Sequence, residues 1–177
     1  MSETGAVETA TRREDGLLVL VCGLPGVGKT TVASTIAERI DGAHLRTDVI
    51  RKELFSDPEY TTTETQRVYE EMLSRARDAI EAGGGVVVDG TFKNQPYRER
   101  AVATANAGGA GFRMVKVECS TDVVRRRIAN RENDASDADF EVHTMYRDRF
   151  EPVSMEHVIV DNSDGMEATL RQVDGHF

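Results

Sequence analysis

The stretch VLVCGLPGVGKTT, residues 19–31, decides the fold because it contains a complete phosphate-binding motif. Two glycines, a lysine and a threonine keep the spacing G-x-x-x-x-G-K-S/T between a predicted strand and a predicted helix. Glycines let backbone N–H groups approach phosphate oxygens, and the helix N-terminus adds its positive dipole end. The lysine carries a charge for the β- and γ-phosphates, and the threonine hydroxyl is a Mg²⁺ ligand. This P-loop, or Walker A motif, predicts nucleoside triphosphate binding by Gly23, Leu24, Pro25, Gly26, Val27, Gly28, Lys29, Thr30 and Thr31.

The length of 177 residues fits one domain. We expect that domain at residues 16–177, after a disordered acidic tail at residues 1–15. No apolar run reaches the length of a membrane span and no secretory signal is evident, so we expect a cytoplasmic protein without membrane contact. Cys22 and Cys119 form no CxxC motif and are expected to be reduced thiols.

The net charge of the chain bears on whether its partner is a nucleic acid. Acidic residues number 31 against 22 basic ones, which gives a net charge of −9. That balance disfavours a protein that coats nucleic acid, because neutralising phosphates is the main source of such binding. The four histidines are scattered through the sequence and suggest no metal site.

Apolar runs alternate with helical periodicity, which predicts βαβ units and a parallel sheet. We predict strands at residues 17–22, 43–46, 86–91, 112–119 and 157–163. Helices are predicted at residues 29–40, 47–54, 64–82, 96–107, 122–131 and 138–150, with a last helix after the fifth strand. The pattern indicates an α/β fold in which a five-stranded sheet lies between two layers of helices.

Asp48 and Arg51 follow the second predicted strand, at the sheet edge where ligands of α/β proteins bind. Three residues apart on one helical turn, they can face the same small molecule. A carboxylate there can take the proton of an attacking hydroxyl, and an arginine can hold an anionic group. The alternative is a capping aspartate that pairs with Arg51.

Three further candidates lie at the end of the third strand or after it. Asp89 can hold Mg²⁺ through a bound water opposite Thr30, or it can face the acceptor, and Thr91 adds a polar contact. Arg98 opens the next helix near the same edge and is a candidate acceptor ligand. A turn aspartate and a solvated surface arginine are the alternatives.

The segment VVRRRIANR concentrates positive charge in an otherwise acidic chain. Arg127 and Arg131 are four residues apart and share a helix face. Two guanidinium groups on that face can close over a triphosphate and stabilise charge on the transferred phosphoryl group. We therefore expect a small arginine lid around residues 122–140, with a solvated charged face as the alternative.

The segments GLPGVGKTT, TDVIRKEL, VVVDGTF and the arginine helix resemble the small P-loop kinases that include zeta toxins, polynucleotide 5′-hydroxyl kinases and gluconate kinases. The resemblance implies a nucleoside-kinase-like P-loop NTPase fold with strand order 2-3-1-4-5 and ATP as the donor. It also implies Asp48 as the acceptor-side base, Arg51 as an acceptor clamp, and Arg127 with Arg131 as lid arginines. By the same analogy Asn162 and Ser163 lie beside the adenine.

Adenylylsulfate kinases share part of this pattern, but Arg46 and Thr47 replace the D-G of their D-G-D-x-x-R element. The sequence thus predicts a phosphotransferase that moves a phosphoryl group from Mg-ATP to a hydroxyl of a small, anionic metabolite. The alternatives are a 5′-hydroxyl polynucleotide or tRNA kinase, an adenylylsulfate-type kinase, and an ATPase or switch without an acceptor. The sequence predicts no oligomeric state.

Overall fold

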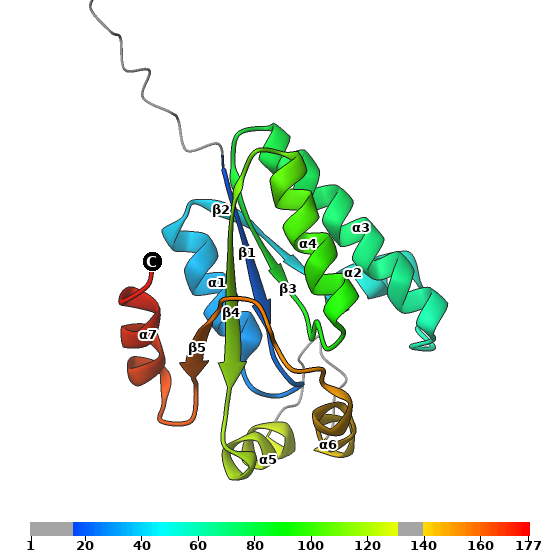
Figure 1. Cartoon of the computed structure of the whole chain (residues 1–177). Coiled ribbons are helices and arrows are strands. Elements are labelled where there is room, and N and C mark those ends of the chain that lie inside the picture. The colour runs from blue at the N-terminus through cyan, green and yellow to red at the C-terminus, as the bar shows by residue number, and fades with distance from the viewer. Residues whose placement is uncertain (1–15, 131–139) are drawn as a thin grey trace, which may run out of the picture.

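Five parallel strands form the sheet in a computed structural model that describes residues 16–130 and 140–177. The strands are β1 (Leu17–Cys22), β2 (Gly42–Arg46), β3 (Gly85–Asp89), β4 (Gly111–Glu118) and β5 (Val158–Asp161). Their order is β2-β3-β1-β4-β5, and each neighbouring pair is parallel (Figure 1). The predicted fold class and strand order are therefore confirmed. The predicted tail at residues 1–15 lies outside the described residues.

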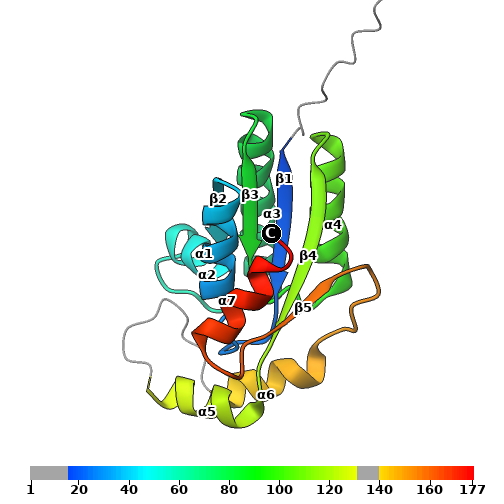
Figure 2. The same cartoon turned by 90° about the vertical axis from the view of Figure 1, so that its left-hand side faces the viewer.

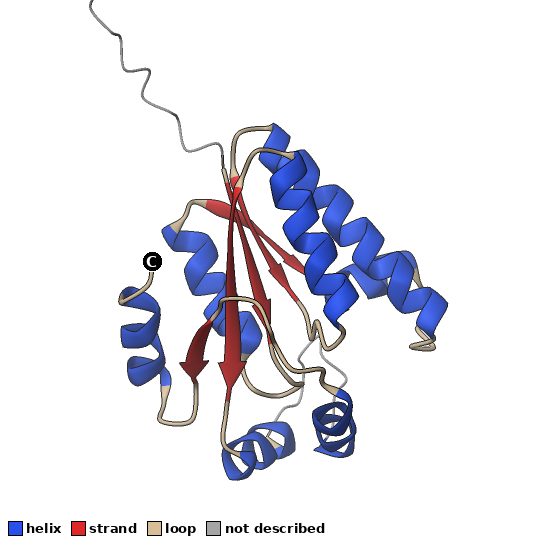
Figure 3. Cartoon of the chain, in the orientation of Figure 1, coloured by secondary structure: helices blue, strands red, loops and turns tan. Residues whose placement is uncertain are grey.

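Helices cover both faces of the sheet, as Figures 1 and 3 show. On one face lie α1 (Lys29–Arg39) and α7 (Met166–Asp174), and on the other lie α2 (Thr47–Leu54), α3 (Thr62–Glu81) and α4 (Gln95–Ala107). Two short helices, α5 (Thr121–Ala129) and α6 (Phe140–Arg149), sit beyond the C-terminal ends of the strands (Figure 2). Within the described ranges, no helix has the length and apolar character needed to cross a membrane.

The sequence of the central strand β1 is apolar without alternation because helices cover the strand on both faces. Leu18, Leu20 and Cys22 pack into the layer of α2, α3 and α4. Val19 and Val21 pack into the layer of α1 and α7. A strand covered on both faces buries every side chain, so both faces must be apolar.

Two strands end two residues earlier than predicted. β3 ends at Asp89 rather than at Thr91, and β5 ends at Asp161 rather than at Ser163. The backbone leaves the sheet after Asp89, and Phe92 in the loop that follows adopts a left-handed conformation with φ 45°. The residues beyond each strand are therefore loop residues, which places Thr91 and Ser163 on the wall of a cavity at this edge of the sheet.

Candidate active site

A cavity of about 1010 Å³ opens at the C-terminal edge of the sheet. Its wall comes from the P-loop, the start of α2, the loop after β3, the helices α5 and α6, and the segment after β5. From the P-loop, the residues that line it are Pro25, Gly26, Gly28, Lys29, Thr30 and Thr31. Gly23, Leu24 and Val27 are not part of that lining, and Val27 belongs to the core.

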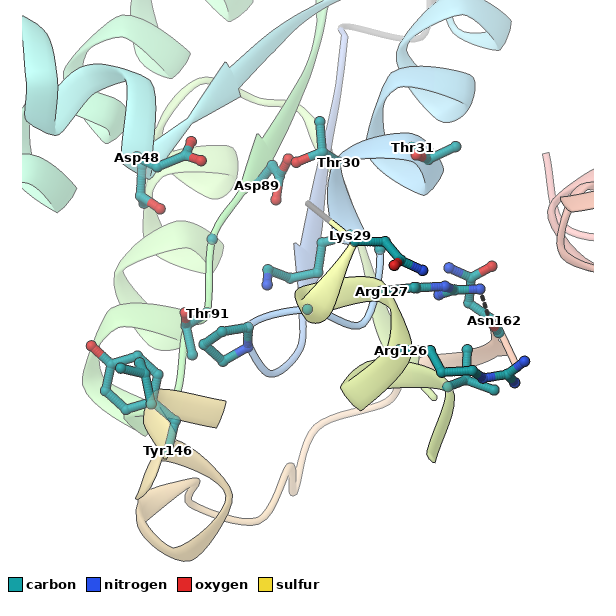
Figure 4. A pocket seen from close by; sticks show the side chains of 18 of the residues that line it. Lys29, Thr30, Thr31, Asp48, Asp89, Thr91, Arg126, Arg127, Tyr146 and Asn162 are labelled. Atoms are coloured by element: carbon teal, nitrogen blue, oxygen red, sulfur yellow. Dashed lines mark hydrogen bonds between the residues drawn. The ribbon is translucent and has the colours of Figure 1, made fainter. Parts of the chain in front are cut away.

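The P-loop turns tightly into α1. Gly28 has φ 89°, and a Cβ atom there would lie 2.2 Å from Nδ2 of Asn162, so only glycine fits. The side chain of Lys29 folds back over the loop, and its Nζ donates to the carbonyl of Leu24 at 2.9 Å. Figure 4 shows Lys29 and Thr30 directed into the cavity from the start of α1.

Asn162 connects the P-loop to the end of β5 and to α7. Its Nδ2 donates to the carbonyl of Val27 at 2.9 Å, and its Oδ1 accepts from the Thr169 hydroxyl at 2.5 Å. The side chain is buried. Asn162 and Ser163 both line the cavity, as their predicted place beside adenine requires. Asn162 has in addition the structural task of holding the P-loop, which the sequence did not reveal.

Arg127 lies against the P-loop in this structure (Figure 4). Its Nη2 donates to the carbonyl of Asn162 at 2.7 Å, and its Nη1 makes longer contacts with the carbonyl of Val27 and with Sγ of Cys119. Arg126 also lines the cavity and was not among the predicted residues. Arg131, the second predicted lid arginine, lies outside the described residues.

Asp48 lines the acceptor side of the cavity at the start of α2. Its Oδ2 accepts from Nη2 of Arg46 at 3.0 Å, and its Oδ1 accepts from the N–H of Val49 at 2.9 Å. The ion pair of Asp48 is thus with Arg46, not with Arg51 as the structural alternative proposed. Two hydrogen bonds hold the carboxylate in one orientation at the cavity wall.

Arg51 also lines the cavity, but its guanidinium is already engaged. Nη1 donates to Glu64 at 2.7 Å and Nη2 donates to Thr65 at 3.1 Å, while the ring of Tyr60 lies 4.8 Å from the guanidinium carbon. Burial opposes the charge of Glu64, but hydrogen bonds from the N–H of Glu59 and from Arg51 outweigh it and lower its pKa below the ordinary value. The buried ion pair therefore fixes Arg51 in place.

The side chains of Asp89 and Thr30 lie next to each other in Figure 4. Both line the cavity, and only 4% of Asp89 is exposed. Mg²⁺ prefers carboxylate and hydroxyl oxygens and keeps several waters, so this pair fits the ion. Nε2 of His44 lies 3.0 Å from Oδ2 of Asp89, a contact across 45 residues that the sequence did not suggest.

Arg98 is a correction to the sequence analysis. Its side chain is 1% exposed, it does not line the cavity, and burial lowers the pKa of its guanidinium. The guanidinium donates to four backbone carbonyls: Phe92 and Lys93 after β3, and Glu151 and Pro152 after α6. Arg98 therefore holds two loops together and is not placed to contact an acceptor.

Helix α6 lies beyond the C-terminal edge of the sheet in Figure 1, and residues of this helix line the cavity. His143 is buried on this helix, and its Nδ1 lies 2.6 Å from the carbonyl of Pro25 in the P-loop. Tyr146, one turn along, lines the cavity. The sequence predicted a helix over residues 138–150 but assigned no site residue to it, so these contributions were missed.

A known protein family and several known proteins are similar to this chain in sequence. Residues 18–153 match the AAA domain family AAA_33. The chain belongs to this family. Among its relatives are uncharacterised proteins of Mycobacterium tuberculosis and Mycobacterium bovis, each 32% identical over 139 residues, or 71% of the chain. The chain spans 28% of the length of those relatives.

Solved structures with a similar fold include a gluconokinase from Sinorhizobium meliloti, with a TM-score of 0.67 and 22% identity over 92% of this chain and 91% of that one. An APS kinase of Mycobacterium tuberculosis, in complex with AMPPNP and APS, gives a TM-score of 0.68 and 15% identity over 90% and 95% of the two chains. These likenesses confirm the predicted P-loop kinase type of fold.

Proposed function

We propose that the chain is a kinase that transfers the γ-phosphoryl group of ATP to a hydroxyl group of a small metabolite. One observation carries the proposal: a single cavity holds the P-loop on one side and an oriented carboxylate, Asp48, on the other. A nucleotide switch or an ATPase has no need of a fixed carboxylate on the acceptor side. The APS kinase that shares the fold was solved with both a triphosphate analogue and an acceptor, which supports the same division of the cavity.

Each residue of the proposed site has a defined task. Lys29 contacts the β- and γ-phosphates, and Thr30 with Asp89 would hold the Mg²⁺. When bound, the ion neutralises charge on the phosphate oxygens. The acceptor oxygen attacks the γ-phosphorus, the bond from the γ-phosphorus to the β–γ bridging oxygen breaks, and the hydroxyl proton passes to Asp48. The products are ADP and the phosphorylated acceptor.

The surrounding charges favour an anionic acceptor of limited size. Lys29, Arg126 and Arg127 line the cavity against the carboxylates of Asp48 and Asp89, and Arg51, which is paired with Glu64, lines it as well. Helix α6 confines the space to about 1010 Å³, which suits ATP with a small partner rather than a folded RNA. We propose Arg51 and Thr91 as acceptor contacts, Arg127 and Arg131 as lid arginines, and the cytoplasm as the place of action.

The test is ADP release from Mg-ATP with and without a panel of hydroxyl compounds. The panel contains sugar acids, nucleosides, nucleotide sugars, adenylylsulfate and 5′-hydroxyl oligonucleotides, so that the alternative kinases are separate outcomes. Asp48→Asn should lower acceptor-dependent release by about 10²- to 10⁴-fold, because the base and its orientation are lost. ATP affinity, measured by titration calorimetry, should stay within about twofold.

Asp57→Asn is the matched control, since Asp57 is exposed and does not line the cavity. ADP release that no acceptor raises and that Asp48→Asn leaves unchanged would contradict the kinase assignment and favour an ATPase. Loss of ATP affinity in Asp48→Asn would instead show that this aspartate is structural.

A further inference from the structure

Strand β2 carries two basic residues in alternate positions, His44 and Arg46. In the parallel register Arg46 is paired with Asp89, and His44 is paired with Val87. Residues two apart on a strand share a face, and so do laterally paired residues. These side chains therefore all lie on the face covered by α1, where Val87 is buried.

On that face each basic residue meets one carboxylate of the cavity. His44 lies 3.0 Å from Asp89, and Arg46 lies 3.0 Å from Asp48. An ionised carboxylate can only accept hydrogen bonds, so Nε2 of His44 must carry the proton and donate it to Oδ2 of Asp89. A buried carboxylate without such a donor would be costly, and its side chain would be free to rotate.

We propose that His44 is a positioning residue that holds the Asp89 carboxylate toward Thr30, so that the two can bind the Mg²⁺ of Mg-ATP. The inference rests on the proposed nucleotide site and goes beyond it, because His44 itself does not line the cavity. A histidine beside a carboxylate ligand fixes the direction of its lone pairs, and loss of such a partner typically lowers metal affinity about 10- to 100-fold. The competing role is purely structural: His44 would satisfy a buried acid and leave Mg²⁺ unaffected.

The experiment measures nucleotide binding as a function of Mg²⁺, which needs no acceptor. AMPPNP is titrated into the wild type, His44→Leu and His44→Gln, first in EDTA and then across a Mg²⁺ series. In His44→Leu the Mg²⁺ concentration that gives half of the affinity gain should rise about 10-fold. Affinity in EDTA should stay within about twofold, because Asp89 then has no ion through which to act.

Glutamine is the conservative variant, since its amide nitrogen reaches nearly as far as Nε2 and can still donate to Asp89. It should restore most of the Mg²⁺ dependence. His157→Leu is the control, because His157 contacts the carbonyl of Met155 away from the cavity. If the leucine variant does not fold by circular dichroism, His44→Asn takes its place, since asparagine remains polar but is too short to reach Asp89.

Three outcomes overturn the proposal. An unchanged Mg²⁺ dependence in the leucine variant leaves His44 with a structural role only. An equal loss of affinity with and without Mg²⁺ shows that the whole P-loop has shifted. A wild type that binds no AMPPNP at all overturns both this inference and the proposed function, whereas the first two outcomes leave the proposed function intact.

Discussion

Replacing Arg98 by methionine should destabilise the fold strongly although Arg98 lies outside the cavity. The guanidinium is 1% exposed and donates to the carbonyls of Phe92 at 2.7 Å, Glu151 at 2.7 Å, Lys93 at 3.1 Å and Pro152 at 3.1 Å. Methionine preserves much of the volume but leaves these four acceptors without their donor. The loop after β3 then loses the part of its link to the segment after α6 that Arg98 supplies, while the bond from the N–H of Glu151 to the carbonyl of Lys93 remains.

The magnitude follows from those four bonds. At about 1 kcal/mol for each lost bond the cost is ~4 kcal/mol. The variant no longer has the cost of burying a charge, which offsets part of this loss. The free energy of unfolding should therefore fall by about 2–4 kcal/mol in total. Single domains are stable by only about 5–15 kcal/mol, so this is a large fraction of the total.

Urea unfolding followed by circular dichroism measures the change. With a slope of about 2 kcal/mol per M, the midpoint of Arg98→Met should fall by ~1–2 M. Arg100→Met is the control, because Arg100 is exposed two residues along the same helix and should shift stability by no more than about 0.5 kcal/mol. A midpoint for Arg98→Met equal to that of the control would refute the claim that the buried guanidinium stabilises the fold, and would favour a solvated surface arginine.

Two further changes test the P-loop and the core. Lys29→Ala should weaken ATP binding by about 10- to 100-fold and abolish turnover, because it removes a charged hydrogen bond to the phosphates. Lys52→Ala is the control, since Lys52 is exposed. Turnover that survives in Lys29→Ala would disprove the P-loop assignment. Burial raises the pKa of the Cys22 thiol from 9.0 to about 11, against the smaller opposing influence of Arg98. Its contribution to stability is therefore complete below pH 9 and is lost as the pH rises toward about 11. Urea unfolding at pH 8, 10 and 11 should show a shallower decline for Cys22→Ala than for the wild type, and identical slopes would contradict the assignment.

Local sequence patterns were enough to predict the elements that position the site. The apolar run of β1 required a strand covered on both faces, and the glycines of the P-loop required a tight turn into α1. Asp48 and Asp89 were found because Asp89 ends one strand and Asp48 comes just after another, and parallel strands end at one edge of the sheet. In each case the signal lies within one stretch of chain.

Contacts between distant segments could not be predicted in this way. His44 and Asp89 are 45 residues apart, and neither residue belongs to a local motif that names the other. The sequence suggests that Arg98 is a surface arginine of a helix, but the loops after β3 and after α6 bury it. The contact between His143 and the P-loop carbonyl likewise depends on where α6 packs.

The sequence by itself determined the order of elements, the P-loop and the edge of the sheet where the cavity opens, because periodicity and turn chemistry act over neighbouring residues. The tertiary structure alone decided which charged groups face the cavity and which partner holds each of them in place. Arg51 is held by Glu64, Asp48 by Arg46 and Asp89 by His44. The physical reason is that burial and hydrogen-bond geometry depend on every element packed around a side chain, and strand register with helix packing sets these only once the chain is folded.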